Sequence, residues 1–142
     1  MSMNQVQQLL LSVRRSGQKS GRDFALIYLM LSTGIRRIEA SRSNICDLVN
    51  RGDRTTLLVQ GKGHNSKDDF VIVHPEVLEV LQHYISRRHG PRNYRAPLFL
   101  NEGTHSGRLL PYTITRIVRH ALDEAGLGGF NLTTHSLRAT TA

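Results

Sequence analysis

The sequence predicts an α+β domain that is mainly helical and carries a small three-stranded antiparallel sheet. Apolar residues recur at helical spacing in residues 4–13, 77–85 and 112–125, and residues 22–31 are apolar on nearly all sides. Residues 47–50, 55–60 and 69–73 are expected to form short strands, the last two being rich in β-branched and aliphatic side chains. With 142 residues and no visible boundary, the chain is expected to form a single domain over residues 1–142.

Local signals mark where the helices start and stop. Pro75 suits the first position of its helix, where a missing N–H costs nothing. Gly34 ends the helix of residues 22–31, because glycine readily adopts a left-handed C-cap. A further helix is expected to start near Ile35 and to carry Arg36 and Glu39 on one face. The apolar helix that precedes Gly34 should be the central element of the fold.

The composition favours a polyanionic partner. The net charge is +8 and the pI is 10.6, and the basic residues are sixteen arginines against three lysines. A GC-rich genome is an alternative cause of the arginine bias. Cys46 is the only cysteine, which excludes an internal disulfide or a multi-cysteine zinc site and fits a reducing cytoplasm. The longest apolar run is too short for a bilayer span and no signal peptide is recognised, so no membrane association is expected.

The stretch from Thr133 to Arg138 places a histidine and an arginine three residues apart near the end of the chain. A threonine can cap a helix N-terminus, and His135 and Arg138 would then project from one face of that helix. A proton-transfer group beside a planar cation at the positive end of a helix suits a phosphate. The alternative is an ordinary helix start with a solvated arginine.

Two further stretches carry candidate cations. Arg36 and Glu39 lie three residues apart after Gly34, and the alternative for them is an ordinary surface ion pair. Lys62 stands between two glycines in the loop of residues 61–68, which connects the second and third expected strands. A lysine at a hairpin tip can reach a neighbouring groove, although a flexible surface turn explains the pattern as well. The loop is not a Walker A motif, because the Gly-Lys-Ser/Thr ending is absent.

Together these stretches resemble the catalytic domain of the tyrosine recombinases, the phage integrase family. Arg36 matches the first arginine of the family's Thr-Gly-x-Arg-x-x-Glu box, and Lys62 matches the hairpin lysine. His135 and Arg138 match the His-x-x-Arg box. Four matches in family order and at family-like spacing are specific, although each is modest alone.

Some matches leave an alternative residue. Arg37 is the alternative first arginine, and Lys67 is the alternative hairpin lysine; both are candidate DNA contacts. Arg36 is preferred because it lies two residues after the glycine and three before Glu39. Ser43 departs from the family pattern, which usually has an apolar residue there.

The resemblance implies DNA strand cleavage and rejoining through a 3′-phosphotyrosine, without a metal or any other cofactor. Arg36 and Arg138 would clamp the scissile phosphate and Glu39 would orient Arg36. His135 would assist proton transfer at the nucleophile, and Lys62 would protonate the leaving 5′-oxygen. The implied partner is a double-stranded DNA recombination site, with self-association on DNA and a tetramer in a full-length parent, in the cytoplasm.

The chain departs from the family at its end. The family's nucleophilic tyrosine follows His-x-x-Arg, whereas Tyr28, Tyr84, Tyr94 and Tyr112 all precede it and none matches the nucleophile. The amino-terminal core-binding domain of the family has no counterpart expected within residues 1–142. We therefore expect an incomplete catalytic domain that binds DNA, does not cleave it alone and tends to self-associate through unpaired apolar surface.

Other functions are weighed against this interpretation. One is a natural truncated integrase relic or a DNA-binding regulator that does not cut, in which the arginines only anchor phosphates. A metal-dependent nuclease is disfavoured because no His-Glu-x-x-His or comparable ligand spacing occurs. A serine hydrolase is disfavoured because no Gly-x-Ser-x-Gly elbow occurs. A type IB topoisomerase is the nearest mechanistic relative, but the Gly-Lys-Gly hairpin is closer to the integrases.

Overall fold

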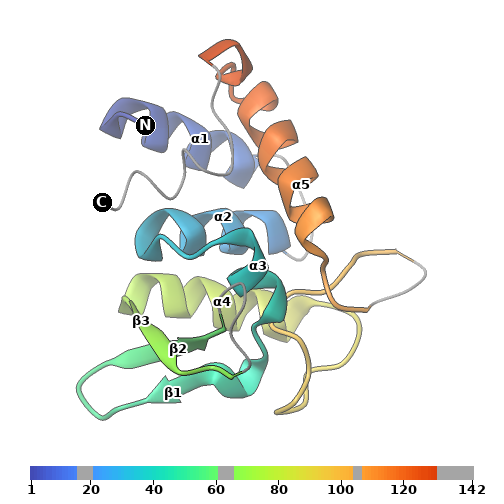
Figure 1. Ribbon diagram of the computed structural model, residues 1–142. Coiled ribbons are helices and arrows are strands. Elements are labelled where there is room, and N and C mark those ends of the chain that lie inside the picture. Colours follow the sequence, from blue (N-terminus) through green and yellow to red (C-terminus); the bar gives the residue numbers. More distant parts are fainter. Residues whose placement is uncertain (16–20, 61–65, 104–106, 131–142) are drawn as a thin grey trace.

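The structure, a computed structural model, describes residues 1–15, 21–60, 66–103 and 107–130 (Figure 1). The predicted α+β class is confirmed: the chain forms α-helices and a three-stranded antiparallel sheet that lies at one side of them. In chain order the elements are α1 (Met3–Arg15), α2 (Arg22–Thr33), α3 (Arg37–Arg42), the 3₁₀ turn η1 (Ile45–Asp47), β1 (Leu48–Asn50), β2 (Thr55–Val59), β3 (Asp69–Val73), α4 (Pro75–Arg87), α5 (Pro111–Glu124) and the 3₁₀ turn η2 (Gly128–Phe130).

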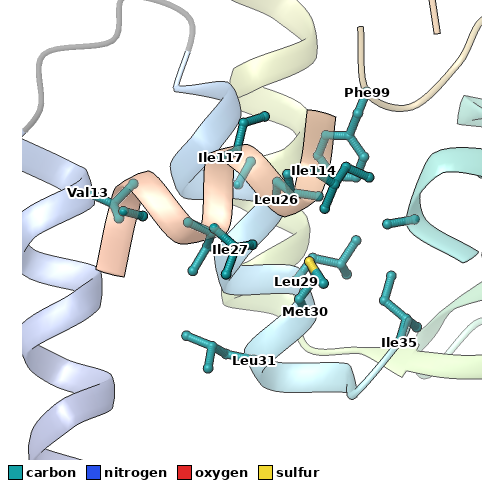
Figure 2. Close-up of a cluster of buried hydrophobic side chains, with 14 of the residues drawn as sticks. Val13, Leu26, Ile27, Leu29, Met30, Leu31, Ile35, Phe99, Ile114 and Ile117 are labelled. Carbon is teal, nitrogen blue, oxygen red and sulfur yellow. The ribbon is translucent and has the colours of Figure 1, made fainter. Parts of the chain in front are cut away.

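Helix α2 lies at the centre of the fold, between α1 and α4 in Figure 1. Its apolar sequence explains this position, because side chains on several sides of the helix are buried. Leu26, Ile27 and Leu29 are all fully buried, and Figure 2 shows them pointing to different neighbours. The sequence-based expectation of a central helix here is therefore confirmed.

The sheet follows the strand order β1-β2-β3, with every pair antiparallel. Leu57 in β2 is opposite Leu48 of β1 and Val71 of β3, which fixes the register on both sides. Leu57, Val59 and Val73 are buried and join the same hydrophobic core as α2. One face of the sheet therefore packs inward, as alternation along a half-buried strand requires.

Helix α5 packs against α1 and α3 through its apolar stripe. Ile114, Val118 and Leu122 recur four residues apart along this stripe and are all buried. Figure 2 shows Ile114 and Ile117 of α5 facing the core beside α2.

No helix among the described residues is long and apolar enough to cross a membrane.

A buried arginine organises the long connection between α4 and α5. The Arg88 guanidinium donates through Nη1 to the carbonyl of Leu98 at 2.6 Å, and through Nη2 to the carbonyls of Pro91 and Pro97 at 2.7 and 2.9 Å. Arg88 is only 5% exposed and its guanidinium also lies over the ring of Tyr84. One side chain thus holds three points of the connection against the end of α4.

Replacing Arg88 with methionine should destabilise the fold. The Leu98 carbonyl would lose a buried donor, at a cost of about 1–3 kcal/mol, and the partly buried carbonyls of Pro91 and Pro97 can bind water instead, so we expect a total loss of about 2–4 kcal/mol. Urea denaturation of Arg88→Met measures this loss. Arg87→Met is the matched control, because Arg87 is exposed and should change the unfolding free energy by less than about 0.5 kcal/mol. Equal stability of the two variants would contradict the anchoring role of Arg88.

Candidate functional site

The corner between α2 and α3 sets the position of Arg36. Gly34 adopts a left-handed conformation with φ of 74°, and its N–H donates to the carbonyl of Met30 to close α2. The Thr33 hydroxyl donates back to the carbonyl of Leu29 at 2.6 Å. Ile35 then returns to the core with only 2% exposure, so the next residue, Arg36, emerges at the surface. A tight glycine turn followed by a buried anchor thus places this arginine.

In the structure Glu39 contacts the main chain of Arg36. The expected helix near Ile35 begins at Arg37, and Arg36 is its extended N-cap residue. Glu39 occupies the third helical position, and its Oε1 accepts the backbone N–H of Arg36 at 2.7 Å, as in one half of a capping box. Glu39 therefore holds the main chain at Arg36 rather than its guanidinium. Among the described residues, no hydrogen bond or ion pair is formed with the Arg36 guanidinium.

Arg37 is placed differently from its neighbour. Its Nη1 donates to the Thr115 hydroxyl at 2.5 Å, which links the start of α3 to α5. Thr115 in turn donates to the carbonyl of Pro111 at 3.3 Å. Of the two adjacent arginines, Arg37 is partly committed to the scaffold, whereas the Arg36 guanidinium remains available for an anion from outside the described structure.

The outer side of α5 extends this cationic corner, a feature that the sequence analysis did not single out. Tyr112, Arg116 and Arg119 are exposed, and their spacing of three and four residues sets them beside Thr115 on the helix surface. We call the surface formed by Arg36, Arg37, Tyr112, Thr115, Arg116 and Arg119 the α3–α5 face. The sequence did carry a signal for this face: the polar and basic residues of α5 recur on the side of the helix opposite its buried apolar residues.

Lys67, the alternative hairpin lysine, is engaged in the structure. Its Nζ forms an ion pair with the Asp47 carboxylate and donates to the carbonyl of Arg42 at 3.0 Å. The Lys67 side chain is 20% exposed and that of Asp47 is 8% exposed. Whether Lys67 also contacts DNA stays a prediction. Lys62, His135 and Arg138 lie outside the described residues, and the catalytic roles of all four predicted residues, Arg36 included, stay predictions as well.

Within the described ranges, no group of three or more His, Cys, Asp and Glu side chains could hold a metal ion.

A separate groove of about 800 Å³ lies between α1, α2 and α4, and it includes Tyr28, Glu76 and Glu79 among its lining residues. Burial, and then the nearby Glu76, raise the pKa of the Tyr28 hydroxyl above its ordinary value. Tyr28 donates to Glu76 at 3.4 Å and therefore belongs to this groove.

The other tyrosines are distributed over the scaffold. Tyr84 is 1% exposed, and its hydroxyl accepts the N–H of Leu100 at 3.1 Å, so its role is structural. Tyr94 and Tyr112 are 72% and 71% exposed, in the long connection and at the start of α5. Tyr112 belongs to the α3–α5 face, where an aromatic side chain beside arginines suits nucleic-acid contact.

Comparisons with known proteins bear on the family and the fold of the chain. The model of the phage integrase family matches residues 1–142. A tyrosine recombinase from Synechococcus elongatus is 29% identical over 133 residues, which cover 92% of this chain and 40% of that protein. The crystal structure of XerA recombinase aligns with a TM-score of 0.78 and 27% identity, covering 99% of this chain and 47% of that one.

A second solved structure shares the fold. XerH site-specific recombinase, bound to its difH substrate in a pre-cleavage complex, aligns with a TM-score of 0.77 and 23% identity over 99% of this chain and 41% of that one. The chain belongs to the phage integrase family, which confirms the resemblance inferred from its motifs. It spans less than half the length of the relatives cited here.

The role of Glu39 at the start of α3 can be tested by substitution. Glu39→Ala removes the acceptor of the Arg36 N–H and should lower the unfolding free energy by about 1 kcal/mol, the usual size of a capping contribution. Glu39→Gln keeps an acceptor oxygen and should retain most of that stability. Urea denaturation midpoints measure both variants. Equal losses in the two variants would show that the capping hydrogen bond contributes nothing.

Proposed function

We propose that residues 1–142 supply the DNA-binding and phosphate-activating part of a site-specific DNA recombinase, which cleaves and rejoins strands through a 3′-phosphotyrosine. The observation that carries this proposal is the exposed, uncommitted guanidinium of Arg36, set at a corner that Gly34 and Glu39 hold in place. Membership of the phage integrase family supports it. The pre-cleavage complex of XerH with its difH substrate supports double-stranded DNA as the partner.

Charge development at the phosphate explains why arginine is needed. Attack on a phosphodiester places negative charge on two non-bridging oxygens, and a preorganised guanidinium stabilises that charge in the transition state. We assign this role to Arg36 and Arg138. His135 would assist proton transfer at the nucleophile, and Lys62 would protonate the leaving 5′-oxygen. A covalent intermediate conserves the energy of the broken bond, so the step needs neither ATP nor a metal.

The α3–α5 face would bind the DNA backbone around the reacting phosphate. Arg36, Arg116 and Arg119 are exposed, and Arg37 is exposed while it contacts Thr115. Arginines on one surface neutralise successive phosphates and release counterions, which makes affinity strongly dependent on salt. The net charge of +8 points in the same direction.

The source of the nucleophile is part of the same proposal. None of the four tyrosines follows the His-x-x-Arg box, and the chain spans less than half of its relatives, so we propose that the attacking tyrosine comes from outside residues 1–142. Self-association on the DNA site, to a tetramer in a full-length protein, and action in the cytoplasm belong to the same proposal. The alternative is a natural relic or regulator that occupies DNA without cutting it.

The DNA-binding surface predicts a specific salt response. Arg119→Met should lower the slope of log affinity against log salt by about 0.9, the value for one phosphate contact on B-form DNA. Arg54→Met is the matched control: Arg54 is exposed, and its β1–β2 turn lies far from α5 in Figure 1. Fluorescence anisotropy with a short duplex measures both slopes. An equal fall in both variants would argue against the α3–α5 face as the binding surface.

The source of the tyrosine predicts a second result. Residues 1–142 alone should form no covalent adduct on a nicked duplex that contains the recombination site, whereas the same residues joined to a tyrosine-bearing segment of the family should form one. Denaturing gels with end-labelled DNA detect the adduct. An adduct with residues 1–142 alone would contradict the missing-nucleophile proposal. Salt-sensitive binding without cleavage, even with the segment present, would favour the regulator.

A further inference from the structure

Both described ends of the hairpin loop between β2 and β3 contact one residue, Arg42, at the end of α3. On the β2 side, Arg42 Nη1 donates to the carbonyl of Gln60 at 3.4 Å. On the β3 side, Lys67 Nζ donates to the carbonyl of Arg42 at 3.0 Å. The last residue of α3 therefore holds the two strands where the loop leaves them.

A buried carboxylate keeps Lys67 in this position. The Asp47 side chain is 8% exposed, and its Oδ2 accepts the backbone N–H of Asn44 at 2.7 Å as well as the ammonium of Lys67. A carboxylate this deeply buried needs a counter-charge, because removal of one partner leaves an uncompensated ion. The Lys67 side chain is only 20% exposed, so its cation is directed inward rather than toward solvent.

Helix α3 connects this cluster to Arg36. The helix has six residues, which correspond to a length of about 9 Å. It packs against α5, α2 and β2, and Ala40 and Ser41 in its middle are buried. Arg36 stands at its first end, and Arg42 stands at its last. A short, packed helix transmits position from one end to the other with little freedom.

From this geometry we infer that Lys67 is a positioning residue, which together with Asp47 and Arg42 holds the described ends of the hairpin loop, Gln60 and Lys67, in fixed relation to Arg36. We call these three residues the hairpin clasp. This differs from the sequence-based expectation that Lys67 contacts DNA. The inference rests on the proposed function, because it concerns how the cations of one phosphate-binding surface are held together. Reacting groups must be placed within about 1 Å, which gives such a clasp its value.

DNA binding by residues 1–142 tests the clasp without requiring cleavage. Lys62 reports on the loop: Lys62→Met should lower the salt slope by about 0.9 if Lys62 contacts a phosphate. Lys67→Met should lower it by a similar amount, since the end of the loop at residue 67 is no longer held, and the double variant should lose no more than either single variant. A direct phosphate contact by Lys67 predicts instead that the two losses add to about twice that value.

Asp47→Asn separates the two roles most sharply. A carboxylate and a phosphate repel each other. If Lys67 simply contacts DNA, replacing the Asp47 carboxylate with a neutral amide should therefore raise the affinity for DNA. If the clasp positions the loop, Asp47→Asn should weaken binding and reduce the salt slope as Lys67→Met does. Lys67→Arg keeps the cation and should retain most of the wild-type slope. A higher affinity for Asp47→Asn, or additive losses for Lys62 and Lys67, would overturn the clasp.

Two controls keep the result interpretable. Arg119→Met, on α5, should reduce the slope by the same amount in the wild type and in Lys67→Met. A general loss of folding in Lys67→Met would instead abolish the effects of both Arg119→Met and Lys62→Met. Circular dichroism confirms that each variant is folded at the temperature of the measurement. If Lys62→Met leaves the slope unchanged while Arg119→Met lowers it, the clasp fails and DNA binding stands. If neither lowers it, the proposed function fails.

Discussion

The burial of α2 is the constraint on which the rest of the structure depends. This helix contacts α1, α3, α4 and β3, so the helices and the sheet are arranged around its apolar surface. Because Gly34 ends the helix and Ile35 returns at once to the core, the chain must expose the residue that follows. The position of Arg36 is therefore a consequence of packing rather than of local charge, and a polar substitution inside α2 would disturb the candidate site from a distance.

The arginines divide into two groups with different physical roles. Arg88 and Arg108 bind backbone carbonyls, and Arg108 donates to those of Ser41 and Ser43 at 2.9 and 3.1 Å, so it ties the end of α3 to the long connection. These cations satisfy carbonyl groups in the last turn of a helix and in irregular segments, where no regular backbone partner is available. Arg36 and the exposed arginines of α5 form the other group. The net charge of +8 thus includes cations that belong to the scaffold, and it overstates the charge offered to DNA.

Periodicity was enough to predict the fold class and the main elements, because burial of one face imposes its spacing on the sequence. The strand predicted at residues 69–73 agrees with β3, and the other helices and strands differ from prediction by a few terminal residues. Details that depend on tertiary contacts were not predictable. The acceptor role of Glu39 depends on the turn at Gly34, and nothing in the sequence separates buried Arg88 from exposed Arg87. Arg36 was found as a site candidate because a motif marked it, whereas the α5 arginines lacked one.

The most direct test of the account compares the two adjacent arginines. In a protein that joins residues 1–142 to a tyrosine-bearing segment, the rate of covalent adduct formation on a nicked site duplex is measured for Arg36→Met and Arg37→Met. Arg36→Met should lower the rate by about 10²–10³, the usual effect of removing one transition-state donor, while its DNA affinity should fall by no more than the loss of one phosphate contact. Arg37→Met should act mainly on affinity, since its guanidinium is shared with Thr115. A rate loss confined to Arg37→Met would contradict the assignment of Arg36 as the phosphate ligand.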